Sequence, residues 1–136
     1  KYMCKRTSET KASINLNLMK KIFCFDLDNT ICNTKKNKYK KATPKKNVIK
    51  LINQLYDKGH IIKIYTARFM GRNFDDINKA KKEGKKFTNK QLKAWGIKYH
   101  KLIMGKPSFD IVIDDKSIFY KKNWPLIIKK KFNIDK

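Results

Sequence analysis

Two short apolar segments that end in aspartates limit the fold of this chain more than any other feature of its sequence. Residues 21–28 read KIFCFDLD and residues 109–114 read FDIVID. Apolar runs of this length and composition are typical of buried strands. Residues 60–66 (HIIKIYT) have the same character, and residues 99–104 predict a weaker strand. The chain therefore carries four candidate strands, and two of them deliver carboxylates to their carboxyl ends.

Helix signals fall between these strands. Thr43 can cap a helix, Pro44 suits the first helical position, and Gly59 ends the apolar periodicity that follows. Further helices are expected at 75–84, 88–95 and 116–124, the second of them started by a capping-box pattern. Because strands and helices alternate, the sequence predicts an α/β fold with a central parallel sheet and helices on both of its faces.

The length of the chain predicts one folded domain. It has 136 residues, which is enough for a hydrophobic core without disulfide or metal staples. Residues 1–18 are polar and lack periodicity, so we expect a poorly ordered N-terminal extension there. We therefore assign residues 19–136 to a single domain.

The chain is strongly basic, with 35 Lys and Arg residues against 11 Asp and Glu residues and a net charge of +24. A basic surface attracts nucleic acids, which leaves polyanion binding as one interpretation. The lysines are spread from end to end, however, and A/T-rich coding alone could produce such a bias. Weak attraction to anionic substrates follows under either interpretation.

Several classes of protein are excluded or disfavoured. The longest apolar runs are far too short to span a bilayer, so we expect no membrane partner. The three cysteines form no C-x-x-C pair and are odd in number, which argues against a disulfide framework or a zinc knuckle. A reducing, cytoplasmic location is therefore expected.

Polar groups follow three of the predicted strands. Since the carboxyl ends of parallel strands meet at one edge of a sheet, these groups should converge there. Carboxylates so close together repel one another and need a cation, and an all-oxygen set suits Mg²⁺. Such a cation beside a carboxylate nucleophile serves phosphoryl transfer. The residues expected at this edge are Asp26, Asp28, Thr66, Lys106, Asp114 and Asp115.

The order of these residues resembles the four motifs of the haloacid dehalogenase (HAD) superfamily. The motifs are Asp26-x-Asp28-x-Thr30, Thr66, Lys106 and Asp114-Asp115. More narrowly, the chain is similar to the small capsule-biosynthesis phosphatases of that superfamily. The stretches that carry this likeness are 25–31, 59–68, 88–92, 95–100 and 105–110. The resemblance implies a three-layer, Rossmann-like core. Residues 31–43 and 67–105 leave no room for a cap domain, so the site should be open.

The resemblance also implies roles for the site residues. Asp26 attacks phosphorus and forms an aspartyl-phosphate, and Asp28 protonates the leaving group and then activates water. Thr66 and Lys106 hold the phosphoryl group. The ligands implied for Mg²⁺ are Asp26, Asp28 through its backbone carbonyl, Asp114 and Asp115.

Two residues are further candidates for binding the substrate. Asn29 lies inside the first motif. Arg68 follows Thr66 by two residues, so it could reach the site and hold a second anionic group. A structural ion pair or an exposed loop position is the alternative for Arg68.

The expected function is Mg²⁺-dependent hydrolysis of a small phosphorylated sugar or related metabolite in polysaccharide biosynthesis. An open site suits a large substrate or a homo-oligomer that covers it. One alternative is a polynucleotide 3′-phosphatase, because the charge and the missing cap would suit DNA ends. Another is a basic nucleic-acid-binding module on a decayed HAD fold.

Overall fold

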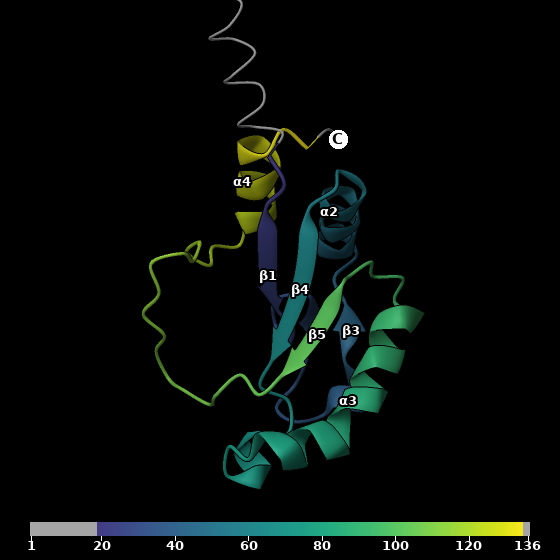
Figure 1. Ribbon diagram of the computed structural model, residues 1–136, viewed down its shortest axis with the longest axis vertical. Helices are drawn as coiled ribbons and strands as arrows, with labels where there is room; N and C mark the ends of the chain where they lie inside the picture. The colour runs from purple at the N-terminus through teal and green to yellow at the C-terminus, as the bar shows by residue number, and fades with distance from the viewer. Residues whose placement is uncertain (1–18, 135–136) are drawn as a thin grey trace, which may run out of the picture.

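A three-stranded parallel sheet lies at the centre of the structure (Figure 1). The structure is a computed structural model that describes residues 19–134, so the extension predicted at 1–18 lies outside the described residues. The strands are β1 (Ile22–Asp26), β4 (Ile61–Thr66) and β5 (Lys101–Met104), in the order β1-β4-β5. These three strands confirm the α/β class, and their parallel pairing confirms the expected sheet type.

A small antiparallel hairpin follows β1. It pairs β2 (Cys32–Asn33) with β3 (Thr43–Pro44), and the short 3-10 helix η1 (Tyr39–Lys41) lies between them. The expectation that Thr43 caps a helix and that Pro44 begins it is therefore wrong. Both residues are held in extended backbone by the hairpin, so the helix α2 (Lys46–Asp57) begins two residues later.

One long helix replaces the two that the sequence predicts between 75 and 95. The helix α3 (Ile77–Ala94) follows the short 3-10 helix η2 (Gly71–Asn73) and runs through Gly84 without a break. Asp76 caps it by accepting a hydrogen bond from the backbone N–H of Lys79 at 3.1 Å. Gly84 does not end the helix. It allows close packing instead, because the ring of Phe69 lies where a side chain at position 84 would be.

The connection from 105 to 123 is irregular, as its wide loop in Figure 1 shows. The strand predicted at 109–114 and the helix predicted at 116–124 are both absent. No neighbouring strand pairs with 109–114, so Ile111 and Ile113 are 81% and 96% exposed. The last described helix, α4 (Trp124–Lys131), begins at the end of this connection and carries Pro125 in its first turn.

The sheet has one buried face and one open face. Burial alternates along β4 and β5, and the inward side chains Phe25, Ile62, Ile64 and Leu102 share one hydrophobic cluster with residues of α2, α3 and α4. The side chains on the other face are all exposed or partly exposed. Among the described residues, the prediction of helices on both faces is therefore wrong.

The direction of the crossovers accounts for this arrangement. Successive right-handed connections that step the same way across a parallel sheet place their helices on one face. The chain steps in one direction from β1 to β4 to β5, through α2 and then α3. A fourth strand beyond β1 would reverse the direction, and the segment expected to supply it is unpaired. No helix within residues 19–134 is long and apolar enough to cross a membrane.

Candidate active site

The carboxyl ends of the strands bring together four of the side chains expected at the site. β1 ends at Asp26, and the buried side chain of Leu27 anchors the turn that carries Asp28. The backbone N–H of Lys106 donates to the carbonyl of Thr66 at 3.1 Å, so the connection after β5 returns to the end of β4. From there the side chain of Lys106 reaches Asp26 at the end of β1.

Asp26 faces a lysine and a hydroxyl. Its Oδ1 accepts a hydrogen bond from Lys106 Nζ at 2.9 Å, and its Oδ2 accepts one from Thr30 Oγ1 at 3.1 Å. The Asp26 side chain keeps 35% of its surface exposed. Both partners are residues of the expected motifs, so the structure confirms that Asp26, Thr30 and Lys106 meet. The arrangement presents a carboxylate that solvent can reach beside a cationic group.

Asp28 is more enclosed and pairs with Arg68. Arg68 Nε lies 2.9 Å from Asp28 Oδ2, and Arg68 Nη2 lies 2.8 Å from Asp28 Oδ1. The hydroxyl of Thr34 also donates to Asp28 Oδ1, at 2.6 Å. The Arg68 side chain is fully buried, whereas the Asp28 side chain is 21% exposed. The structure thus places Arg68 in an ion pair, which is the alternative to the substrate contact expected from the sequence.

Three residues that the sequence did not single out complete the surroundings of Asp28. Besides Thr34, these are Gln91 and Tyr39, which both contact Arg68. The Gln91 amide joins Arg68 to the backbone of Tyr39, a residue 52 positions away in the chain. No local pattern could have found this contact, because Gln91 reads in the sequence as part of a helix-capping signal.

Thr66 and Asn29 serve the backbone in this structure. The Thr66 hydroxyl accepts a hydrogen bond from the backbone N–H of Arg68 at 3.1 Å, and Thr66 is buried. Asn29 adopts a positive φ of 64°, and its Oδ1 accepts from the backbone N–H of Thr34. Its carbonyl accepts from Tyr120 Oη at 2.9 Å, so the irregular connection is tied to the end of β1. Contact of Thr66 and Asn29 with a substrate stays a prediction.

Asp114 and Asp115 do not join the other carboxylates. Both are exposed on the irregular connection, and the Asp114 carboxylate accepts from the backbone N–H of Lys116 at 2.8 Å. Within residues 19–134, no group of three or more His, Cys, Asp and Glu side chains forms a cation site. The expected convergence fails because it depended on a strand at 109–114.

Two cysteines flank the site. Burial raises the pKa of the Cys24 thiol, and the nearby Lys63 and Lys106 oppose this effect. Burial also raises the pKa of Cys32, whose Sγ lies 3.6 Å from Asp28 Oδ1. A raised pKa favours the neutral thiol over the thiolate in both residues.

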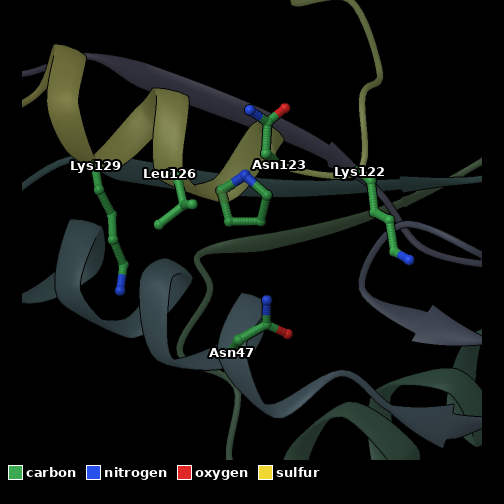
Figure 2. Close-up of a pocket in the computed structure, with 6 residues that line it drawn as sticks. Asn47, Lys122, Asn123, Leu126 and Lys129 are labelled. Carbon is green, nitrogen blue, oxygen red and sulfur yellow. The ribbon is translucent and has the colours of Figure 1, made fainter.

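An open groove lies elsewhere, between α2 and the first turn of α4 (Figure 2). Its lining includes Asn47, Lys122, Leu126 and Lys129, and it shares no residue with the carboxyl-end site. In Figure 2 the side chains of Lys122 and Lys129 lie at opposite ends of the groove and do not converge on one point. The chemistry-bearing residues are thus gathered at the carboxyl ends of the strands.

The fold and the site together define an α/β protein with paired acidic and basic groups at the carboxyl edge of a parallel sheet. No family model matches the sequence, and no curated protein matches it. The structure is similar to a crystal structure from Vibrio cholerae that is described as that of an MCSG target, with a TM-score of 0.68. The two chains are 22% identical, and the match covers 85% of this chain and 98% of the other. At this identity the likeness establishes the fold.

Proposed function

We propose that the protein is a phosphatase of the HAD superfamily, with a Rossmann-like core, that hydrolyses phosphomonoesters through an aspartyl-phosphate on Asp26. The observation that carries this proposal is the position of Asp26 at the end of β1, partly exposed and 2.9 Å from Lys106 Nζ. A carboxylate nucleophile needs access to the substrate and a neighbouring cation that offsets the charge of the phosphoryl group.

Each step has a residue to carry it out. An Asp26 oxygen attacks phosphorus while the bond to the leaving oxygen breaks, and that oxygen takes a proton from Asp28. Water then attacks the phosphoryl-enzyme, gives a proton to Asp28 and releases phosphate from Asp26. Lys106 offsets the charge on the phosphoryl oxygens throughout. The covalent intermediate thus replaces one step that has a very high activation barrier by two steps that have lower barriers.

Mg²⁺ fits the chemistry of the donor set, because hard divalent cations prefer carboxylate and carbonyl oxygens. Asp26 and the backbone of Asp28 would hold it together with Asp114 and Asp115. When bound, it would neutralise negative charge on the phosphate and on these carboxylates. The proposal requires the irregular, exposed connection 105–123 to carry Asp114 and Asp115 towards β1.

A small phosphorylated sugar or related metabolite in the cytoplasm is the substrate that we propose. The likeness of several sequence stretches to capsule-biosynthesis phosphatases supports this choice. The net charge of +24 favours a second candidate, a polynucleotide 3′-phosphatase. Counterion release distinguishes the two, because turnover of an oligonucleotide would fall steeply with salt.

Phosphate release from a panel of substrates tests the proposal. The panel contains sugar phosphates, polyol phosphates, nucleotides and 3′-phosphorylated oligonucleotides, each with and without Mg²⁺. Asp26→Asn should abolish turnover, because the amide is a poor nucleophile. Asp57→Asn is the matched control, since Asp57 makes a 2.8 Å ion pair with Lys98 on an exposed surface. Mg²⁺-dependent turnover that survives Asp26→Asn would contradict the proposed mechanism.

A further inference from the structure

The guanidinium of Arg68 binds the carboxylate of Asp28 in a fixed orientation. Its Nε and Nη2 donate to the two different oxygens of Asp28, at 2.9 Å and 2.8 Å. Two parallel hydrogen bonds to one carboxylate fix its rotation as well as its position, which a single contact cannot do. Because the Arg68 side chain is fully buried, an anionic group of a substrate has no access to it in this geometry.

The far side of Arg68 is held as firmly as the near side. Arg68 Nη1 donates to Gln91 Oε1 at 2.6 Å, and Gln91 Nε2 donates to the carbonyl of Tyr39 at 2.8 Å. The Tyr39 ring covers the guanidinium, with its centroid 4.9 Å from Arg68 Cζ. Arg68 is therefore held by Gln91 of helix α3 and by Tyr39 of helix η1, and Arg68 in turn holds Asp28.

Such an arrangement is poorly explained as a device for stability alone. Removing an arginine and a carboxylate from water is costly, and well-packed apolar side chains often stabilise a core as well or better. Asp28 also keeps a fifth of its side chain exposed. The arrangement thus holds a carboxylate rigidly while leaving part of it accessible.

We propose that Arg68 is a positioning residue that orients Asp28 towards the phosphoryl group on Asp26, and that Gln91 and Tyr39 hold Arg68 for this purpose. The inference rests on the proposed phosphatase function, in which Asp28 exchanges protons with the leaving group and with water. It replaces the role in substrate binding that the sequence suggested for Arg68. The two roles differ in their kinetic consequences.

A positioning residue affects kcat, whereas a residue that binds substrate affects KM. Arg68→Lys keeps the positive charge but cannot grip two oxygens at once. We expect kcat to fall by about 10- to 100-fold, the loss typical when an orienting partner of a functional side chain is removed. KM should stay within about threefold of the wild-type value, since the substrate does not touch Arg68.

Two further variants distinguish a positioning role of Arg68 from a general effect of substitution. Gln91→Leu leaves both hydrogen bonds from Arg68 to Asp28 possible but removes the acceptor of Nη1, so a smaller loss of kcat is expected. Arg72→Lys is the matched control, because Arg72 makes a 2.8 Å pair with Glu83 and contacts a ring, but both partners are substantially exposed. This control should leave kcat and KM unchanged.

A spectroscopic measurement reports on the ion pair without any turnover. The chain has three arginines, Arg6, Arg68 and Arg72, so their Nε–H signals in a nitrogen–proton NMR spectrum are easily separated. The Arg68 signal should exchange slowly with water and should change in Asp28→Asn. This spectrum also shows whether each variant remains folded.

The outcomes separate the two proposals. A rise in KM with unchanged kcat in folded Arg68→Lys would overturn the positioning role while leaving the phosphatase intact. Unchanged kinetics, with the Arg68 signal altered, would do the same. Absence of turnover by the folded wild-type protein in Mg²⁺ on the whole panel would overturn the proposed function, and the positioning role with it. A fall in kcat alone, graded from Arg68→Lys to Gln91→Leu, supports the inference.

Discussion

Replacing Gly84 by alanine tests why helix α3 is continuous. In an isolated helix this substitution stabilises by about 1 kcal/mol, because alanine loses less backbone entropy than glycine. In this structure, however, a Cβ at position 84 would overlap Cδ2 and Cε2 of the Phe69 ring. The two effects have opposite signs, so their sizes decide the result.

The packing around Phe69 indicates that the clash is the larger effect. Its ring lies against the Tyr39 ring, with centroids 4.9 Å apart, and Arg72 Cζ lies 5.0 Å from the centroid of the Phe69 ring. Moving the ring therefore disturbs both neighbours. Overpacking of this kind costs typically about 1–3 kcal/mol, and the gain in helix propensity offsets about 1 kcal/mol of it. We expect the free energy of unfolding to fall by up to about 2 kcal/mol in Gly84→Ala.

Urea denaturation followed by circular dichroism measures this difference. Lys85→Ala is the control, because Lys85 is the next residue in α3 and is exposed. Its stability should stay within about 0.5 kcal/mol of wild type. If Gly84→Ala proves more stable than wild type, Phe69 moves without cost, and the continuity of α3 must be ascribed to something other than this contact.

Three further expectations concern the metal, a histidine and the turn after β1. Mg²⁺ should slow amide hydrogen exchange at 109–115 and leave α2 unchanged, whereas equal exchange with and without Mg²⁺ would contradict the proposed ligands. Burial lowers the pKa of His60 below 6.5, with help from nearby lysines, so the folded state prefers the neutral ring. Stability should therefore decrease as pH falls below 6.5 towards the lowered pKa, and the urea midpoints of His60→Asn should lack this decrease. Leu27 is fully buried, so Leu27→Ala should cost about 2–5 kcal/mol in urea denaturation; a loss below 1 kcal/mol would show that the turn can collapse into the cavity.

The sequence predicted the parts of the fold that depend on local pattern. The strands at 22–26 and 61–66 are predictable because both are short apolar runs, and Phe25, Ile62 and Ile64 lie on the buried face of the sheet. The start of α2 was missed because pairing with 32–33 holds Thr43 and Pro44 extended. Such pairing between distant segments overrides the local preference for a cap and is invisible in a short window.

The candidate site likewise contains residues that local pattern predicts and residues that depend on contacts between distant segments. Asp26 and Lys106 were predictable because each stands at or just after a strand end. The segment 109–114 has a strand's composition, but composition does not supply a neighbouring strand, so its position could not be predicted. Gln91 was missed because its contacts to Arg68 and Tyr39 span 23 and 52 positions.

The outer edge of β1 and the exposed side chains at 111–113 bear on how copies of the protein behave together. Within residues 19–134 no strand pairs with the outer edge of β1, and an unpaired strand edge is a template for association between chains. Mutual repulsion at a charge of +24 opposes this association in dilute salt, and added salt screens the repulsion within about 10 Å at 0.1 M. Salt therefore has two effects on this molecule: it weakens attraction to a polyanion and it lets copies approach one another. A fall in oligonucleotide turnover with salt reports on substrate binding only where light scattering shows that the state of association of the protein has not changed.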